Sequence, residues 1–413
     1  MAKIPALLRL CAPHTGSSSS KVSVTIHIAG AGDKQPKVFT TSDKIEGVVT
    51  ITVVEKTSFD DIKITLEGIS KVMTWGGING PPLVGARQTF MKLHYPIEKS
   101  TYQLPSILEP GWCYKFSFTF VVPENLTLTP CEGKKDDAGI KNAHTRLPPS
   151  MSKETDTECF SIKYIVRVVI LGPIYGKDKP TKRLVHAVRP VKILPSGSMG
   201  CPGDLSIKML SSHKDIRIRH GWRGKCAGRL AVLASPTGPI RPPFCRTDAA
   251  DHAKTSIKVD LRYSPVGTEP PPRLRKVYSK LNLVTSFHTT PREQHPCFKE
   301  NKSSNLPSGN HVQSLMLPKF DIASAQWAKV QSPSTSVSSP WQDYQANFNN
   351  EEATYTASIV VPISVPMHDD LVPSFHSRFI SRMYTLELIL SYCTANGPRR
   401  SAVKIEVPIE ATS

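Results

Sequence analysis

The side chains best suited to chemistry in this sequence are cations that alternate with apolar residues. In the string "DIRIR", Arg217 and Arg219 are separated by Ile218. On a β-strand, where successive side chains point to opposite faces, both guanidinium groups would lie on one face. Neighbouring guanidinium groups bind phosphate or carboxylate oxygens through paired hydrogen bonds. The spacing therefore predicts an anion-binding strand face, with an ordinary solvated strand face as the alternative.

Two groups of cations extend this pattern along the chain. The first lies in "YGKDKPTKRLVHAVRPVK" and the second in "HKDIRIRHGWRGK", on either side of a joint rich in Gly and Pro. We expect them to bind a phosphorylated segment, an acidic protein tail or an anionic lipid surface. The candidate binding residues are Lys177, Lys179, Lys182, Arg183, Arg189, Lys192, Arg217, Arg219, Arg223 and Lys225.

The overall charge agrees with an acidic partner. The chain has 52 Lys and Arg against 34 Asp and Glu, which gives a formal net charge of +18. A surplus of this size attracts anions but does not choose among them. Nucleic acid is the rival partner, and it favours aromatic side chains interleaved with the cations. The second group contains Trp222 alone, so we rank nucleic acid behind the other partners.

Catalytic motifs are missing from the sequence. The strings GxSxG, HExxH, GxGxxG and the phosphate-binding loop do not occur in it. The string "HDD" at residues 368–370 is interpreted as a polar turn rather than part of a metal or hydrolytic site. We therefore expect a protein that is not an enzyme and has no cofactor and no metal.

Cysteine usage and hydropathy indicate the compartment. The nine Cys are odd in number and none are spaced as CxxC, so neither a disulfide framework nor a zinc site is predicted. Arg9 interrupts the short apolar stretch near the start, which is a poor match to a signal peptide. No stretch has the eighteen or so apolar residues of a spanning helix. A soluble protein in a reducing compartment is expected.

The elements that must position the cations are β-strands. Runs such as "VSVTIHI", "YKFSFTFVVP" and "FSIKYIVRVVI" alternate apolar and polar residues, as half-buried antiparallel strands do. The 36 Pro argue against long helices. Two blocks of such strands flank "LPSGSMGCPGD", where breakers interrupt the pattern. The sequence predicts an all-β protein of two tandem antiparallel β-sandwiches with immunoglobulin-like architecture.

The domain limits follow from the same pattern. We expect a disordered N-terminus (1–20), a first sandwich (21–194), a linker (195–204) and a second sandwich (205–413). Residues 289–352 are rich in Ser, Asn, Gln and Pro and show no usable period, which predicts a disordered insertion in the second sandwich. Ser332 and Ser339 in it each precede Pro and are candidate phosphorylation sites, with an unmodified spacer as the alternative.

Two short strings far apart in the chain are nearly alike. "LPPSM" begins at Leu147 and "LVPSF" at Leu371, and each is followed by an alternating run that contains a Tyr. In such strings Pro fixes φ and marks a strand edge or a turn, while Ser can bond nearby backbone groups. We interpret the two strings as equivalent entries into long strands of two similar sandwiches.

The tandem strand blocks and several strings resemble the arrestin-like proteins, most closely the fungal arrestin-domain proteins. The strings are "DKIEGVVTI", "IKITLEGIS", "YKFSFTFVVPENL" and "LVPSFHSRFISRMYTLELIL". The resemblance covers residues 22–194 well and residues 203–410 less evenly. One feature departs from the family: many fungal members carry PPxY, whereas "PPLV", "PPSM", "PPFC" and "PPPRL" lack the Tyr.

The resemblance implies a non-catalytic cytosolic adaptor. Such a protein binds cytoplasmic regions of membrane receptors or transporters and links them to endocytic, sorting or ubiquitination machinery. It would lie peripherally at the plasma membrane or endosomes, and its contact with a ubiquitin ligase is expected to be indirect. Two alternatives remain: a trafficking-coat or sorting subunit of the same architecture without receptor-tail binding, and a basic nucleic-acid-associated protein.

Overall fold

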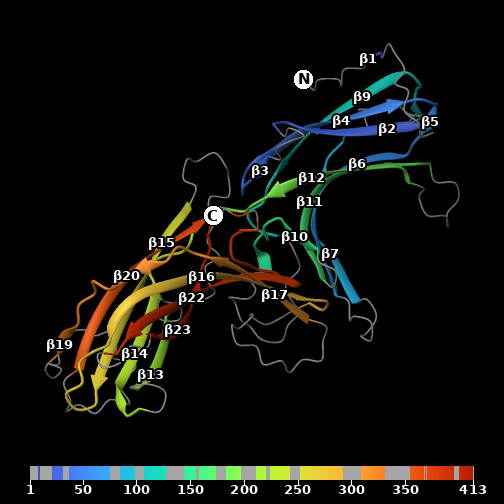
Figure 1. The fold of residues 1–413 in the computed structure, drawn as a ribbon. Coiled ribbons are helices and arrows are strands. Elements are labelled where there is room, and N and C mark those ends of the chain that lie inside the picture. Colours follow the sequence, from blue (N-terminus) through green and yellow to red (C-terminus); the bar gives the residue numbers. More distant parts are fainter. Residues whose placement is uncertain are drawn as a thin grey trace. The chain divides into compact units, whose positions relative to one another are not determined.

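The structure confirms the all-β prediction. The computed structural model describes residues 8–9, 21–30, 37–74, 84–97, 107–126, 144–154, 158–173, 183–196, 211–219, 224–241, 252–291, 308–330, 354–366, 368, 370–394 and 400–412. Within these ranges the regular elements are strands arranged in several sheets (Figure 1).

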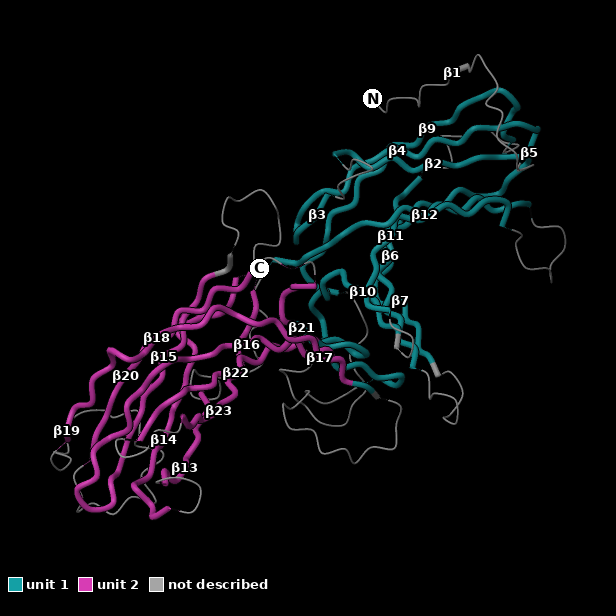
Figure 2. The backbone as a smooth tube through the Cα atoms, viewed as in Figure 1, with its two compact units in different colours: residues 1–197, 286–309, 375–381 teal, residues 198–285, 310–374, 382–413 magenta. Residues whose placement is uncertain are grey.

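The chain divides into two compact units (Figure 2). Unit 1 comprises residues 1–197, 286–309 and 375–381, and unit 2 comprises residues 198–285, 310–374 and 382–413. The first division, between Gly197 and Ser198, falls inside the expected linker. Two later segments, 286–309 and 375–381, were expected in the second sandwich but group with unit 1.

Unit 1 contains a four-stranded and a six-stranded sheet. The four-stranded sheet has the order β1 (Leu8–Arg9), β9 (Trp112–Val121), β4 (Lys44–Val53), β2 (Val22–Ile28). The six-stranded sheet has the order β3 (Val38–Phe39), β12 (Arg183–Ile193), β11 (Glu158–Leu171), β6 (Asp61–Thr74), β7 (Val84–Tyr95), and β10 (Met151–Glu154) also pairs with β11. A separate ribbon joins β5 (Thr57–Ser58) and β8 (Ile107–Leu108). Except for β3, which runs parallel to β12, the ladders are antiparallel.

A five-stranded and another six-stranded sheet are built mainly from unit 2 residues. The five-stranded sheet has the order β13 (Ser212–Arg219), β14 (Cys226–Pro236), β15 (His252–Pro265), β20 (Thr354–Pro366), β19 (Ala328–Val330). The six-stranded sheet has the order β17 (Ser308–Met316), β16 (Arg273–His288), β22 (Ile380–Cys393), β21 (Phe375–His376), with β18 (Phe320–Asp321) on β16 and β23 (Arg400–Ile409) on β22.

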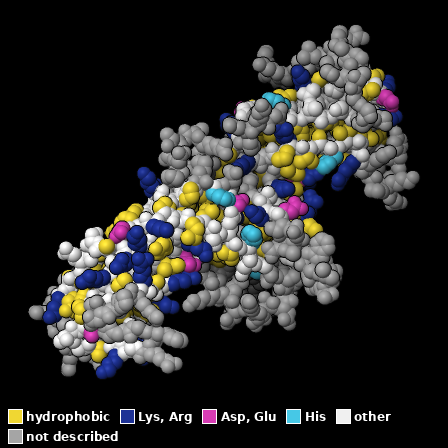
Figure 3. Space-filling model, in the orientation of Figure 1, with side chains coloured by type: hydrophobic (Ala, Val, Ile, Leu, Met, Phe, Trp, Pro, Cys, Tyr) yellow, Lys and Arg dark blue, Asp and Glu magenta, His cyan; other side chains and the backbone are white. Residues whose placement is uncertain are grey.

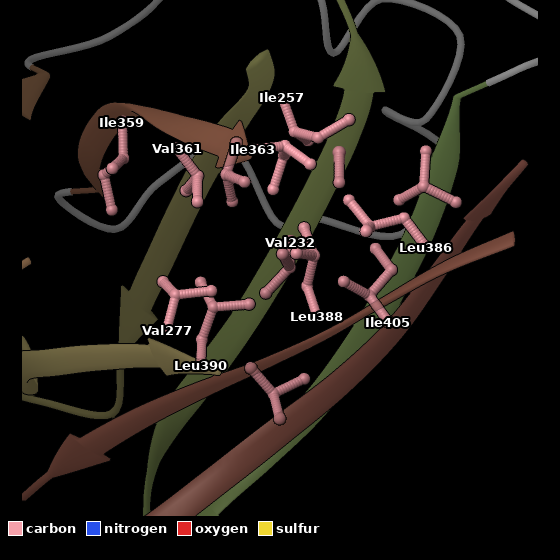
Figure 4. Packing of buried hydrophobic residues seen from close by; sticks show 14 of the residues in the cluster. Val232, Ile257, Val277, Ile359, Val361, Ile363, Leu386, Leu388, Leu390 and Ile405 are labelled. Carbon is pink, nitrogen blue, oxygen red and sulfur yellow. The ribbon is translucent and has the colours of Figure 1, made fainter. Parts of the chain in front are cut away.

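Alternation of side chains gives unit 2 its core. Val232 on β14 and Ile257 on β15 point inward from one sheet, and Leu388 on β22 points inward from the other. The three side chains are buried in one cluster, and Figure 4 shows Val232 beside Leu388. Burying an aliphatic side chain of this size stabilises the fold by about 1.5–3 kcal/mol. Packing of these alternate positions therefore fixes which face of each strand remains outward.

The two units repeat one design. In unit 1, β2–β4–β9 pairs Ile28 with Gly47, and in unit 2, β13–β14–β15 pairs Ile218 with Gly228. The parallel pairing of β3 with β12 also has a counterpart, because Ile240 forms a parallel bridge to Ala411 just after β23. The strands β6, β11 and β12 therefore correspond to β16, β22 and β23.

The doubled strings lie at equivalent places in this design. The buried Tyr164 hydroxyl donates to the Pro148 carbonyl at 2.6 Å, and the Tyr384 hydroxyl donates to the Val372 carbonyl at 2.5 Å. In each unit the acceptor belongs to the residue just before the Pro of the Pro-Ser pair. The predicted equivalence of the two strings is confirmed.

The Ser of each pair ties the turn to a later strand. Ser150 donates its backbone N–H to the Ile193 carbonyl, and its hydroxyl accepts the Ile193 N–H at 2.9 Å. In unit 2, Ser374 makes the same two hydrogen bonds with Ala411, the second at 3.0 Å. These residues are parts of the scaffold, as the repeat of both patterns indicates.

The structure corrects part of two expectations of disorder, and apart from residues 289–291 the remainder of both segments lies outside the described residues. Leu8 and Arg9, within the expected disordered N-terminus, pair with β9 as β1. Residues 308–330, within the expected insertion, contain β17, β18 and β19. β17 was missed because the half-buried face of this sheet-end strand includes His311 and Gln313, so apolar alternation is absent.

Removing the tyrosine hydroxyls tests their role in the scaffold. Tyr164→Phe and Tyr384→Phe should each lower the free energy of unfolding by about 1–2 kcal/mol, because a buried carbonyl loses its donor. Urea denaturation measures the change. Tyr278→Phe is the control, since its ring, beside Lys319, keeps its cation–π contact. Equal stability of all three variants would contradict a structural role for these hydrogen bonds.

Close packing requires a glycine at position 228 of β14, which corresponds to Gly47 in unit 1. A Cβ at Gly228 would lie 2.5 Å from the Tyr263 ring and 2.6 Å from the Ser264 carbonyl oxygen. We expect Gly228→Ala to destabilise the protein by about 1–3 kcal/mol through overpacking. Gly238→Ala, where a Cβ meets nothing within 4 Å, should leave the thermal unfolding temperature unchanged or slightly raised. The same shift in both variants would exclude this packing explanation.

Candidate anion-binding face

The outer face of β13, β14 and β15 brings arginines from three strands together. The register pairs Arg217 on β13 with Arg229 on β14, and Arg229 with Ser264 on β15. Arg262 on β15 lies diagonally from Arg229, because it pairs with Ala231. Diagonal neighbours in an antiparallel sheet are about 7–8 Å apart, within reach of long side chains. We call Arg217, Arg219, Arg229 and Arg262 the arginine face.

Inward-facing residues explain why these cations face outward. Ile216 packs against the unit 2 core and Ile218 is buried within it, and they alternate with the exposed Arg217 and Arg219. The alternation predicted for this string is therefore confirmed. A register shift between Ile218 and Arg219 skips Ala227 on β14, yet Arg219 remains exposed.

Carboxylates already neutralise part of this surface. Asp215 accepts from Arg229 through Nε at 2.6 Å and lies 2.5 Å from its Nη2. This hydrogen bond raises the pKa of Arg229 above its usual range, against the lowering effect of partial burial. Lys258 on the same face lies 3.2 Å from Asp260. Burial lowers the pKa of Arg262, the innermost cation of the face.

Arg217 and Arg219 differ from Arg229 in having no carboxylate partner among the described residues. Within the described ranges neither makes an ion pair, and both are exposed. Arg217 also lies directly opposite another arginine, a placement that is unfavourable unless an anion is nearby. These two guanidinium groups are therefore the part of the arginine face that is open to an external anion.

The equivalent face of unit 1 lacks this chemistry. Where unit 2 aligns Arg217, Arg229 and Ser264, unit 1 aligns His27, Val48 and Ser117. The next row, Thr25, Thr50 and Lys115, has a single cation. Since both units form the same three-strand arrangement, the arginines are not needed to build it.

The structure does not unite all of the residues predicted as one site. Arg189 and Lys192 on β12 lie on opposite faces of the strand, because they are an odd number of residues apart. Arg189 pairs with Val166, whose side chain is in the unit 1 core, and Arg183 is exposed at the start of β12. Lys225 is exposed just before β14. The calls at Lys177, Lys179, Lys182, Arg223, Ser332 and Ser339 lie outside the described residues.

Two arginines of the face were missed in the sequence. Arg229 and Arg262 occupy outward positions in "RLAVLAS" and "SIKVDLRYS", which were recognised as strands. Their alternation with buried Leu230 and Leu261 was the available signal. What the sequence did not contain was the register that places them beside Arg217.

In two other sheets a buried carboxylate holds some of the cations in local ion pairs. On β22, Glu387 lies 3.0 Å from Lys404 and 3.9 Å from Lys280, on the two neighbouring strands. On β6, Glu67 lies 2.9 Å from Arg167 and 3.9 Å from Lys92, again on both neighbours. These two carboxylates are nearly buried, so the surrounding cations neutralise buried charge and contribute to the stability of the fold.

Other candidate chemistry is weak in the described part of the chain. His368 accepts the Asp370 N–H at 3.2 Å through Nδ1, which agrees with a polar turn. Among the described residues no group of His, Cys, Asp and Glu is arranged to hold a metal ion. Cys113, Cys159, Cys226 and Cys393 are free thiols. Nor does any described helix have the length and apolar character to cross a membrane.

Comparisons with known proteins add no name to this surface. No family model matches the chain, and no curated protein matches it. Figure 3 shows Lys and Arg side chains on the visible side of unit 2, which also has exposed cations outside the arginine face, such as Arg273 and Arg275 on β16.

The Glu387 ion pairs predict a pH dependence. Burial alone would raise the pKa of Glu387, but hydrogen bonding and charge from Lys404, with Lys280 and Asn282, lower the pKa below its usual range. A lowered pKa stabilises the fold above the unfolded-state value and loses that effect as the pH falls through the folded value. Glu387→Gln should therefore flatten the decline in unfolding free energy between about pH 5 and pH 3.

A neighbouring carboxylate provides the control for this measurement. Glu406 also contacts Lys404, at 3.0 Å, but its side chain is 54% exposed. Glu406→Gln should keep the acid decline of the wild type, because an exposed ion pair contributes little. If the unfolding free energy of Glu387→Gln falls with decreasing pH as it does in the wild type, the buried carboxylate does not cause the loss of stability in acid.

Proposed function

We propose that the protein is a non-catalytic adaptor that binds acidic stretches in cytoplasmic regions of membrane receptors or transporters. Unit 2 binds the acidic stretch through the arginine face. The chain then links the bound membrane protein to endocytic, sorting or ubiquitination machinery. This places the protein in the cytoplasm, peripherally at the plasma membrane or endosomes.

The observation that carries this proposal is the exposed pair Arg217 and Arg219, which form no ion pair with any described residue. Both are exposed on a strand whose opposite face is packed into the core, so the packing fixes the side of the strand from which they project. Exposed guanidinium groups favour carboxylate and phosphate oxygens. The matching face of unit 1 shows that a sandwich of this design folds without them.

The adaptor role rests on the resemblance to arrestin-like proteins. That family binds cytoplasmic parts of membrane proteins and has no catalytic site. The missing PPxY string favours indirect recruitment of any ubiquitin ligase. A trafficking-coat or sorting subunit would share the architecture but would not bind receptor or transporter tails.

Nucleic acid is the second candidate, because the formal net charge is +18. Binding of single strands uses aromatic side chains as stacking platforms. The outward-facing residues of β13, β14 and the described part of β15 include no Phe, Trp or Tyr. The arginine face is therefore better suited to an acidic protein segment.

Charge reversal tests the proposal. The double variant Arg217→Glu/Arg219→Glu should weaken binding of a fluorescent peptide rich in Glu and phosphoserine by more than about ten-fold, since attraction becomes repulsion. Lys44→Glu/Lys115→Glu, an equal charge change on exposed unit 1 positions, is the matched control and should stay within about two-fold. Fluorescence anisotropy measures the dissociation constant.

Affinity purification with the same variants connects this binding to cargo. Membrane receptors or transporters should be recovered with the wild type and the Lys control but lost with the Arg variant. Equal peptide binding by all variants, or recovery of nucleic acid in place of membrane proteins, would overturn the adaptor proposal.

A further inference from the structure

We propose that the acidic partner segment binds in extended form as an additional β-strand along the edge of β13 that no described strand occupies. It carries two acidic residues separated by one apolar residue. This inference rests on the proposed function for the acidic nature of the partner, and it adds the binding mode and the spacing of the recognised residues.

The edge of β13 is available for strand addition. β13 is the terminal strand of its sheet and, among the described elements, forms a ladder with β14 alone. β23 of the facing sheet approaches β13 at the corner of the sandwich without forming a ladder with it. A terminal strand presents backbone N–H and C=O groups that an extended segment can pair with.

The two faces of β13 define the order of residue types in the partner. Arg217 and Arg219 face outward, so acidic residues two positions apart on an added strand would lie opposite them. The residue between those acids would face inward, like Ile218. Ile216 on the same inward side is only partly buried and would gain cover from an apolar neighbour. The favoured arrangement is therefore acid, apolar, acid.

The cations on this edge also provide selectivity. Charged residues on an edge strand discourage unwanted pairing with other chains. An acidic strand removes that penalty, whereas a neutral or basic strand leaves the arginines unpaired or repelled. Asp215, the carboxylate on the same face of β13, is held by Arg229 and does not neutralise Arg217.

The equivalent edge of unit 1 serves as an internal contrast. β2 is also the terminal strand of its sheet, and its positions matching Asp215 and Arg217 are Thr25 and His27. Its edge, with which no described strand pairs, therefore lacks a pair of arginines. An acidic segment is expected on β13 and not on β2.

Peptides that differ only in order test this binding mode. Two ten-residue peptides of identical composition would carry either Glu-Val-Glu or Glu-Glu-Val at the centre, with Ser and Thr elsewhere. Fluorescence anisotropy with the full chain should give at least a ten-fold lower dissociation constant for Glu-Val-Glu. The Arg217→Glu/Arg219→Glu variant should abolish this preference, and Lys44→Glu/Lys115→Glu should retain it.

Backbone methylation separates strand addition from simple charge attraction. Two versions of the Glu-Val-Glu peptide would carry N-methyl groups on alternate residues, one set in each phase. One version should lose binding and the other should retain it, because only alternate N–H groups face β13. An anionic membrane or a nucleic acid would show no such dependence.

The outcomes distinguish this inference from the proposed function. Equal affinity for both peptide orders, or equal tolerance of both methylation phases, would overturn strand addition while Arg-dependent binding of acidic peptides persists. Binding of no acidic peptide by the wild type would overturn the proposed function itself. Tighter binding to vesicles containing anionic lipid than to any peptide would also reject the strand-addition mode.

Discussion

In each unit a buried tyrosine hydroxyl donates to the carbonyl that precedes a Pro-Ser pair, and the Ser then bonds a later strand on both its donor and acceptor sides. Proline cannot continue a ladder, so the chain must turn at this point. The tyrosine fixes the turn against its own long strand, and the serine fixes it against the next. The register of two neighbouring strands, and hence which side chains face the core, depends on this arrangement.

Much of the fold could be predicted because half-buried strands record burial in their sequence. Val49 and Ile51 on β4, and Val166 and Val168 on β11, alternate with outward residues, so type and facing were readable. β17 and β1 were not readable, since a terminal strand or a two-residue pairing is held by backbone hydrogen bonds and needs no apolar alternation. The grouping of residues 286–309 with unit 1 depends on contacts distant in sequence, which local patterns do not contain.

The candidate site shows the same division between local and distant information. Alternation with Ile218 was enough to place Arg217 and Arg219 on one exposed face. It was not enough to show that Arg229 lies opposite Arg217, or that Asp215 neutralises one of these cations and leaves the other open. Arg189 and Lys192 are also close in the sequence, but they are three residues apart on one strand. Their side chains therefore lie on opposite faces of β12. Charge counts therefore identify a basic protein, while register decides which charges remain available.

The duplicated three-strand arrangement has a consequence for how this protein can diversify. Ile28 with Gly47 and Ile218 with Gly228 keep the same pairing, while the outward positions of the first two strands differ in charge. The inward positions of these strands thus determine the fold, and the outward positions of the same strands determine which partner can bind. Substitutions at a few outward positions could change the partner of one unit. The same arginines could also be introduced at the matching outward positions of the other unit without changing a core residue.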